Sequence, residues 1–463
     1  MYSARSFGAM IAAVKAMSVS NSVSSYFESH AVSFEITPIA AATRLDRRRW
    51  LRTLLCVDSQ GGVLVIVPHD DFLDMAALRD LSKREWRPVY ADEQHVALIN
   101  LNEIGLVPLG GLLGIATVMH SGIPRDGKLH FTGPDRTSVV SLDASALHAA
   151  QREVSYLDIA CEITPDWLAQ RQQQQIFTRK RVEALLEDVQ GLPAMPEMAQ
   201  RILHVAGDAD STAQDLAKVI EVDPSLSAQI ISYATSAFYG YRGDITSVRD
   251  AISRVLGFEL VANIAVGISL GTTFKVPAEG PIGLSAFWRH AVYTSALAER
   301  LCKAVPRDRQ VRPGVAYLSG LLHDFGYLVL GHILPTAFGA LNQAIAANPT
   351  LNVTVVESLI LGMSHTEIGA RLLLLWKLPD EAVVAARYHH TPDYRAEDAV
   401  YAHLVSLAES LLHTEGVISD ADATPNDITH ALLGLDDAAL AKAAQPILDA
   451  CAELDTLSHL LSR

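Results

Sequence analysis

Two patterns of apolar residues divide the chain. In the first third, apolar side chains come in short blocks, such as residues 50–57 and 63–67 on either side of the turn 58–62. Short apolar blocks around a glycine-containing turn predict a β-hairpin. From about residue 191 onward, apolar residues recur at i, i+3 and i+4, which predicts a succession of packed amphipathic helices. The fold class predicted is therefore multidomain, with an N-terminal α+β part followed by an all-α bundle.

Capping residues mark the ends of several predicted helices. Asp223 is followed by a proline, a typical N-cap with proline at the first helical position. Ser247 is placed to cap a helix that closes at Gly257. Ser211 and Gln214 have the spacing of a capping box. In the first third, Asp74 is an N-cap candidate for a short helix after the hairpin. Local signals thus agree with the helical periodicity.

Glycine, proline and composition place the domain boundaries. A polar, glutamine-rich tract made of helix formers ends at the stretch 191–196, which contains one glycine and two prolines. We predict an N-terminal domain over 1–150, a helical linker over 151–190, a helical domain over 191–413 and a helical tail over 414–463. The tail is expected to pack on the bundle or to mediate self-association.

Composition narrows the classes of protein. With 463 residues, 49% of them hydrophobic, the chain can form two or three domains with large cores. Its 37 Lys and Arg against 52 Asp and Glu give a net charge of -15, which argues against general binding to nucleic acid or an anionic membrane. The four cysteines are widely spaced and no apolar run approaches the ~18–20 residues of a membrane span. These features favour a cytoplasmic protein without disulfides.

The candidate chemistry of the second part is centred on the adjacent pair His323 and Asp324, at the end of an apolar run. Neighbouring side chains of a helix diverge by only about 100°, so this pair can offer an imidazole and a carboxylate to one metal ion. Further histidines lie in segments with helical periodicity, namely His290, His365, His389 and His390. A helical bundle can bring all of them to one point.

Each of these histidines also has a structural explanation. His290 can be a core residue that is hydrogen-bonded within its helix. Ser364 and Glu367 have capping-box spacing, so His365 is expected in a first helical turn, where neutral imidazole is favoured. The pair His389–His390 can end a helix. For each histidine taken alone, the structural explanation is preferred. The number of such histidines favours a metal site.

The helical part contains ordered motifs at 192–196, 223–226, 236–240, 245–252 and 256–257. Together, over about residues 185–400, they resemble the HDOD domain, a signalling-associated branch of the HD hydrolase superfamily. In metal-binding HD proteins the ligands come from an early histidine, a His-Asp doublet, later histidines and a late aspartate. The resemblance implies these candidate ligands here: His290, His323, Asp324, His365, His389 or His390, and Glu409 in the place of the aspartate. Iron, manganese or zinc would suit this donor set.

Catalysis is less well supported by the same resemblance. The related HD-GYP phosphodiesterases have a lysine where this chain has Tyr327, and a Gly-Tyr-Pro motif where this chain continues with residues 391–394. A carboxylate for a second metal would fall at Ala286, which cannot be a ligand. The sequence therefore favours a ligand- or partner-binding module over an enzyme. A metal-dependent phosphohydrolase acting on a nucleotide or cyclic dinucleotide is the alternative.

A second resemblance concerns residues 20–150, through the stretches 26–32, 52–54, 67–74 and 105–110. Their order is similar to the YbaK family of aminoacyl-tRNA deacylases, also found as editing domains associated with prolyl-tRNA synthetase. The family's catalytic lysine falls at Arg52. Arginine cannot readily lose a proton, so deacylation is expected to be lost. Editing activity remains an alternative.

The candidate pocket of this domain combines Arg52 with the loop residues Gly105, Pro108 and Gly110. The loop backbone can approach a ligand closely, but an ordinary tight turn is the preferred explanation. Basic residues cluster nearby, at Arg44, Arg47, Arg48, Arg49 and Arg52. They can meet RNA phosphates or acidic groups on a partner, or they can form a solvated face, which is the commoner case.

These observations give one leading hypothesis. The protein is expected to be a bacterial-type cytoplasmic regulator in which a degenerate YbaK-like domain is joined to an HDOD domain. The HDOD domain would bind a regulatory protein partner or a small nucleotide-like ligand. The N-terminal domain would be the site of any tRNA contact, and the chain is a candidate for homo-oligomerisation.

Overall fold

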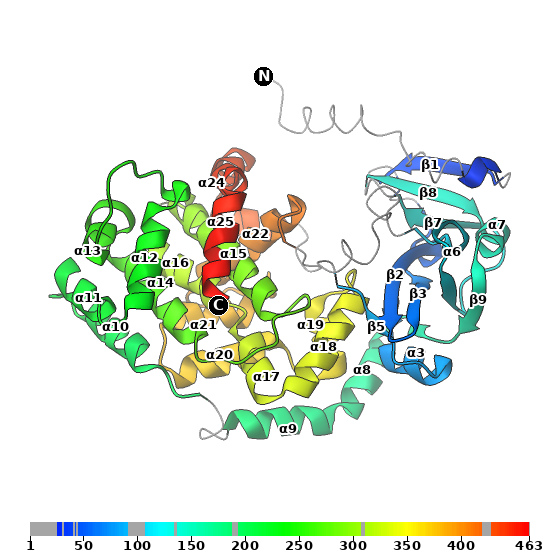
Figure 1. Ribbon diagram of the computed structural model, residues 1–463, viewed down its shortest axis with the longest axis horizontal. Helices are drawn as coiled ribbons and strands as arrows, with labels where there is room; N and C mark the ends of the chain where they lie inside the picture. Colours follow the sequence, from blue (N-terminus) through cyan, green and yellow to red (C-terminus); the bar gives the residue numbers. More distant parts are fainter. Residues whose placement is uncertain are drawn as a thin grey trace. The chain divides into compact units, whose positions relative to one another are not determined.

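Figure 1 shows the computed structural model of the chain. It describes residues 26–29, 32–39, 42, 45–90, 107–133, 137–187, 193–306, 311–418 and 427–462. The chain forms two compact units: unit 1 contains Met1–Ala169 and Gln343–Leu351, and unit 2 contains Gln170–Asn342 and Asn352–Arg463. Unit 1 holds a mixed sheet and unit 2 is helical. The prediction of a mixed N-terminal part and a helical C-terminal part is confirmed.

The main sheet of unit 1 has the strand order β1-β8-β7-β2-β3-β6-β9, with β5 also paired to β2. Its strands are β1 (Phe34–Pro38), β2 (Trp50–Asp58), β3 (Gly61–Pro68), β5 (Arg87–Pro88), β6 (Ala116–His120), β7 (Lys128–Thr132), β8 (Ser138–Asp143) and β9 (Arg152–Leu157). β2 and β3 form the predicted antiparallel hairpin, whereas β2–β7, β3–β6 and β6–β9 are parallel pairs. β4 (Phe72–Leu73) and β10 (Ala160–Cys161) make a separate two-stranded sheet.

The hairpin lies at the centre of the sheet because both of its faces are apolar. Along β3, Leu64 and Ile66 belong to one core cluster, while Val63, Val65 and Val67 belong to another. This alternation follows from the two-residue period of a strand. Around the sheet lie the short helices η2 (Arg47–Arg49), α3 (Met75–Ser82), α6 (Gly110–Leu113) and α7 (Ala144–Ala149). Asp74 caps α3 as predicted, accepting from the backbone of residues 76 and 77.

The helical part begins with α8 (Pro165–Gln174), α9 (Ile176–Glu187), α10 (Glu197–Gly207), α11 (Ala213–Ile220), α12 (Pro224–Thr235), η3 (Ala237–Tyr239), α13 (Val248–Asp250), the π-helical turn η4 (Ala251–Leu256) and α14 (Phe258–Gly271). It continues with α15 (Leu284–Ala304), α16 (Pro313–Leu322), α17 (Phe325–Ile333), α18 (Pro335–Ala347), α19 (Val353–Ile360), α20 (His365–Leu375), α21 (Asp380–Tyr388), α22 (Ala399–Thr414), α23 (Asp427–Leu433), α24 (Asp437–Asp449) and α25 (Cys451–Leu461). In the part of the chain that the structure describes, no helix is long and apolar enough to cross a membrane.

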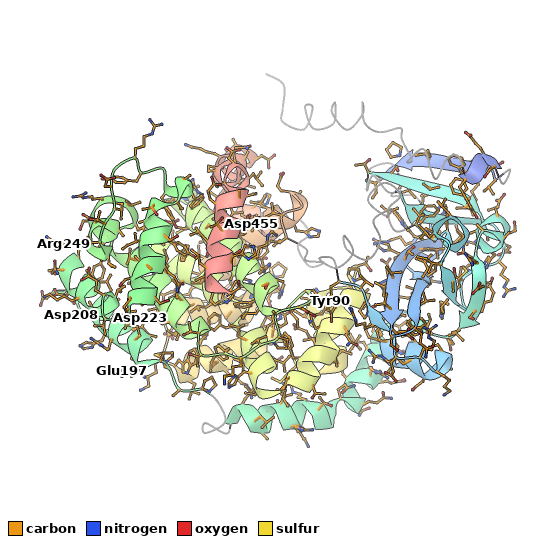
Figure 2. All side chains as sticks on the ribbon, in the orientation of Figure 1. Tyr90, Glu197, Asp208, Asp223, Arg249 and Asp455 are labelled. Atoms are coloured by element: carbon orange, nitrogen blue, oxygen red, sulfur yellow. The ribbon has the colours of Figure 1, made fainter. Side chains whose placement is uncertain are left out.

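Most of the predicted caps are present. Asp223, labelled in Figure 2, lies at the start of α12 and accepts from two backbone N–H groups there. Ser247 accepts from the backbone of Asp250. The predicted capping box was wrong by one residue, because Thr212 and Asp215 form it in place of Ser211 and Gln214. The carboxylate at 215 accepts hydrogen bonds from the N–H and hydroxyl of Thr212, and a charged acceptor is stronger than the amide of a glutamine.

The segment 151–190 is not helical throughout, in contrast to the expected linker. Residues 152–157 form β9 because they pair in parallel with β6 at the edge of the sheet. Residues 160–161 form β10, and only α8 and α9 match the helix-forming composition. At the far end of the chain, Asp455, labelled in Figure 2, lies on α25. It accepts a hydrogen bond from Arg289 of α15, so the predicted tail packs on the bundle.

Two glycines allow the helices of unit 2 to come close where the candidate ligands lie. A Cβ on Gly320 of α16 would come within 2.7 Å of Ser295 Cα on α15. A Cβ on Gly326 of α17 would overlap the carbonyl oxygen of His365 at the start of α20. Close backbone approach of this kind requires glycine. The helices that carry the His-Asp doublet are thereby held near those that carry the other histidines.

Candidate metal centre

Seven side chains of unit 2 converge in the interior of the bundle, and we call them the His/Asp centre. They are His290 from α15, His323 and Asp324 from the junction of α16 and α17, His365 from α20, His389 and His390 from the end of α21, and Glu409 from α22. The doublet lies where one helix ends and the next begins, since His323 is the C-cap of α16 and Asp324 the N-cap of α17. All the metal ligands predicted from the sequence are therefore neighbours.

A first group of donor atoms surrounds His290. Its Nε2 lies 3.0 Å from His323 Nε2, 3.2 Å from Glu409 Oε1 and 3.5 Å from Asp324 Oδ2. His323 Nε2 is in turn 3.1 Å from Glu409 Oε1 and 3.4 Å from Asp324 Oδ2. Two ligands about 2.1 Å from one metal ion, at an angle of 90–109°, are about 3.0–3.4 Å apart. The four donor atoms thus have the spacing of a metal coordination shell.

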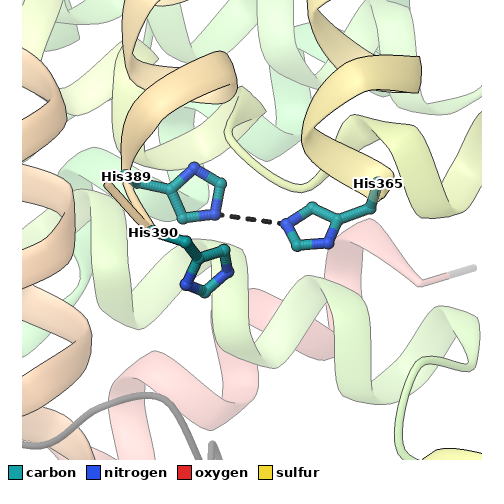
Figure 3. A group of neighbouring side chains, drawn as sticks. All are labelled: His365, His389 and His390. Carbon is teal, nitrogen blue, oxygen red and sulfur yellow. Dashed lines mark hydrogen bonds between the residues drawn. The ribbon is translucent and has the colours of Figure 1, made fainter. Parts of the chain in front are cut away.

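A second group lies on the other side of Asp324. Its Oδ1 is 3.1 Å from His365 Nε2 and 3.7 Å from His389 Nε2, and these two nitrogens are 3.2 Å apart. Figure 3 shows His365 and His389 facing each other, with His390 beside them. A ligand nitrogen of His390 lies within 4.8 Å of the other two. Because its two oxygens face different groups, the Asp324 carboxylate is shared between them.

The Nδ1 atoms of three histidines face acceptors, which directs Nε2 towards the interior of the centre. His323 Nδ1 is 2.7 Å from Gly320 O, and His389 Nδ1 is 2.9 Å from Ala385 O. A carbonyl can only accept, so each Nδ1 carries a proton and a neutral ring presents the Nε2 lone pair. His365 Nδ1 faces the Glu357 carboxylate at 2.7 Å. This arrangement is typical of histidines that bind metals through Nε2.

Charge and burial act against each other in the centre. Burial alone would lower the pKa of His323, but the carboxylates of Asp324 and Glu409 outweigh it and raise the pKa to about 10. Burial would raise the pKa of Asp324, yet His323 and His365 hold it well below its usual range. Burial lowers the pKa of His390 to about 4, so that its ring is neutral. The carboxylates therefore require cations, which protons or metal ions can supply.

The chemistry of the donor set fits a divalent transition metal. Imidazole nitrogen and carboxylate oxygen together are the ligands that zinc, iron and manganese take in proteins. Two imidazole Nε2 atoms at 3.2 Å cannot both present lone pairs to each other without a proton or cation between them. The replacement of the expected aspartate by Glu409 does not remove this ligand, because its Oε1 reaches both His290 and His323.

The N-terminal candidates have partners within their own unit. Arg52, on β2, is buried, and its Nη2 donates to Asp71 O and to Asn348 Oδ1, both at 2.8 Å. The backbone N–H of Gly110 and the carbonyl of Pro108 are both bonded to the Gln151 side chain. A Cβ on Gly110 would overlap the Thr117 hydroxyl, so packing explains this glycine. Gly105 lies outside the described residues.

The basic cluster of unit 1 is accompanied by acidic side chains. Arg47 pairs with Asp70, Arg48 with Glu162 and Arg49 with Asp46 and Asp126. These pairs offset the local positive charge that would attract phosphates. Arg44 lies outside the described residues.

Glu357, which holds His365 in place, was not among the residues predicted from the sequence. A signal for it exists in the sequence, since Glu357 is the one ionisable residue in the otherwise apolar or hydroxyl-bearing segment 353–360. A charged residue in a segment that must be buried needs a partner. The identity of that partner, eight residues later, depends on how α19 and α20 fold back on each other.

Comparison with known proteins follows the same division of the chain. The HDOD domain family matches residues 192–392. A crystal structure of a "Putative signal transduction protein" from Marinobacter aquaeolei VT8 is 30% identical, with 93% of this chain and 96% of that chain covered and a TM-score of 0.76. An HDOD domain protein with unknown function from Geobacter sulfurreducens is 21% identical, with coverages of 62% and 98% and a TM-score of 0.50, which is a likeness of fold.

An uncharacterized protein from Treponema pallidum (strain Nichols) is 24% identical over 232 residues. The match covers 50% of this chain and 44% of that protein, so the chain spans less than half of the relative's length. The prediction of an HDOD domain in the C-terminal half is confirmed by these similarities.

Proposed function

Because this chain belongs to the HDOD-domain family, we propose that it is a signalling protein whose helical unit binds two divalent transition-metal ions and hydrolyses a phosphoester. The observation that carries the proposal is the position of Asp324, whose Oδ2 faces His290 and His323 and whose Oδ1 faces His365 and His389. Divalent ions held in this way supply Lewis acidity towards a phosphoryl oxygen and towards water.

The residues of the chain divide the work of holding such ions. His290, His323 and Glu409 would hold one ion, and His365, His389 and His390 the other. His390 is only half-buried, whereas His365 and His389 are buried, so it is the ligand nearest to solvent on its side. Burial lowers the pKa of its ring, so the ring is neutral at neutral pH and can offer a lone pair to a metal ion.

The site lacks the lysine of HD-GYP phosphodiesterases, and this affects the expected substrate. Tyr327 stands in its place and stacks on the His365 ring, with centroids 4.5 Å apart and planes at 24°. An aromatic ring gives no positive charge for a phosphate. Small phosphoesters or nucleotide-like ligands, held mainly through the ions, are therefore the substrates we expect. A regulatory protein partner would respond to the occupancy of the site.

Metal analysis of the wild-type chain, purified without chelators, tests the proposal. We expect about two equivalents of transition metal in the wild type, loss of one ion in His323→Ala and loss of both in Asp324→Ala. Hydrolysis of bis(p-nitrophenyl) phosphate and of a nucleotide panel is then measured on the metal-loaded protein. Less than one-tenth equivalent of metal would end the proposal. Bound metal without hydrolysis of any tested ester would leave a binding module and remove the enzyme.

The remaining expectations concern unit 1 and the cell. Similarity to aminoacyl-tRNA deacylases stays a prediction for this unit. The engagement of the Arg52 guanidinium by Asp71 O and Asn348 supports a structural role for that residue over a catalytic one. A cytoplasmic location, self-association and tRNA contact through unit 1 also stay predictions.

A further inference from the structure

Glu357 is a fully buried carboxylate, and both of its oxygens accept hydrogen bonds from one residue, His365. It lies on α19, and its Oε1 is 2.7 Å from His365 Nδ1 while its Oε2 is 3.0 Å from the backbone nitrogen of His365. Its exposed fraction is 0%. Burial of an unpaired carboxylate is strongly unfavourable, so two N–H donors at these distances account for its presence.

The backbone contact places Glu357 at the N-terminus of α20, an eleven-residue helix that begins at His365. Free N–H groups at a helix N-terminus attract negative charge. The contact with Nδ1 then fixes the proton on that nitrogen and leaves Nε2 to face Asp324 Oδ1 and His389 Nε2, at 3.1 and 3.2 Å. One carboxylate thus sets both the place of the ring and its tautomer.

Aromatic contacts complete the restraint on this ring. Tyr327 stacks on one face of it, and the ring of His390 meets it edge-on, with centroids 5.2 Å apart and an interplanar angle of 90°. A ring held in its plane can still flip by 180° about the Cβ–Cγ bond, which would exchange Nδ1 with Cδ2 and Nε2 with Cε1. The bond from Nδ1 to Glu357 opposes that flip, because the flipped ring would turn a carbon towards the buried carboxylate.

The two donor groups differ in what the Nδ1 atoms of their histidines contact. In the group around His290, the Nδ1 of His323 rests on a neutral carbonyl, and so does that of His389 in the second group. His365 rests on a carboxylate, which makes an imidazole a stronger electron donor than a carbonyl does. A carboxylate behind a histidine ligand typically changes metal affinity by about 10- to 100-fold.

We propose that Glu357 is a positioning residue that gives the His365 group its affinity for metal, so that the two ions of the centre are held with different strengths. The inference rests on the proposed function, because it assumes that the centre binds two metal ions. It predicts that loss of the carboxylate weakens binding of the ion in the His365 group and leaves binding of the ion in the His290 group unchanged.

The test compares Glu357→Gln with Glu299→Gln. Glutamine keeps the shape of the side chain but has a single acceptor oxygen for the two donors of His365. Glu299 is a matched control, because it is equally a buried glutamate and pairs with Lys303, while it lies about 13 Å along α15 from His290. Stoichiometry and dissociation constants are measured by competition with a chromophoric chelator, and Co²⁺ absorption reports the ligand field of each site.

For Glu357→Gln we expect the second ion to bind about 10- to 100-fold more weakly, with the first unchanged. For Glu299→Gln we expect two ions of wild-type affinity. Equal loss of both ions in Glu357→Gln, or two ions of wild-type affinity, would overturn the inference. Glu357→Ala serves as a second variant if the glutamine side chain bonds to both donors through water.

A readout without metal separates this inference from the proposed function. In metal-free protein with ¹⁵N-labelled histidine, the signals of His365 are identified by their loss in His365→Ala. We expect Nδ1 of His365 to carry a proton in the wild type and its signal to shift in Glu357→Gln but not in Glu299→Gln. An unchanged Nδ1 signal of His365 in Glu357→Gln would refute the positioning role, whereas absence of metal from the wild type would refute the proposed function alone.

Discussion

At the scale of the residue, Asp324 is the side chain on which the two halves of the His/Asp centre depend. Each of its oxygens lies within 3.1–3.7 Å of two histidine nitrogens. A shared carboxylate of this kind cannot be replaced by an amide, because one end of an amide is a donor without ligand capacity. Glu409, in contrast, has its ion pairs, among the described residues, with His290 and His323.

The first prediction follows from this difference. Asp324→Asn is expected to lower the affinity for both ions, by about 100-fold or more, which exceeds the usual effect of an outer residue. Glu409→Gln is expected to weaken one ion and spare the other. Titration of the metal-free proteins with Zn²⁺ or Mn²⁺ measures both. A variant Asp324→Asn that kept one ion at wild-type affinity would show that the carboxylate is not shared.

At the scale of the element, the centre depends on how closely α17 approaches α20. Gly326 lies against the carbonyl of His365, and any Cβ there must displace one helix from the other. Overpacking of this kind costs about 1–3 kcal/mol. We therefore expect Gly326→Ala to lower the free energy of unfolding by that amount and to weaken metal binding, as measured by denaturant titration and metal competition.

Gly339, in α18, provides the matched control for this prediction. A Cβ at that position meets no atom within 4 Å. Alanine is the better helix former, so Gly339→Ala is expected to stabilise the protein by about 0.5–1 kcal/mol and to leave metal binding unchanged. If both variants behaved alike, the close approach at Gly326 would not be what positions the ligands.

Elements with a local cause were predictable from the sequence, and those with a distant cause were not. The hairpin of β2 and β3 and the caps at Asp223 and Ser247 follow from neighbouring residues. β9 was placed in a helical linker because its strand character comes from pairing with β6, a partner more than thirty residues away. Propensity is a weak guide where tertiary pairing decides.

The same distinction applies to the site. The histidines and the doublet could be proposed from helical periodicity and resemblance, and the structure brings them together. The opposite orientation of the two Asp324 oxygens depends on the junction between α16 and α17, which spacing in sequence does not describe. Glu357 could not be predicted for a similar reason. Its contact with His365 forms only because the chain folds back between α19 and α20.

At the scale of the whole molecule, the chain leaves unit 2 at residue 343, contributes nine residues to unit 1 and returns at residue 352. Asn348 ties this segment to unit 1. Its Oδ1 accepts from Leu73 N and from Arg52, each at 2.8 Å, and its Nδ2 donates to Leu73 O and Ala344 O. These bonds satisfy the backbone N–H and carbonyl of Leu73 in β4 and reach Nη2 of Arg52. Burial lowers the pKa of Arg52 to about 10 against the opposing effect of Asp71.

The last prediction concerns this segment. Asn348→Ala leaves buried donors and acceptors of unit 1 without partners, and an unsatisfied buried group costs about 1–3 kcal/mol. We expect faster hydrogen exchange in β4 and β10, measured by mass spectrometry.

Asn342→Ala is the control for this prediction. It removes an equally buried amide that is bonded to Ile282 N and Glu279 O in unit 2. This variant is expected to affect residues 279–282 and to leave β4 protected. Equal protection of β4 in both variants would mean that segment 343–351 does not stabilise unit 1. α19 begins directly after this segment and carries Glu357. Metal affinity measured on Asn348→Ala therefore also tests whether the hydrogen bonds of Asn348 affect metal binding by the His/Asp centre.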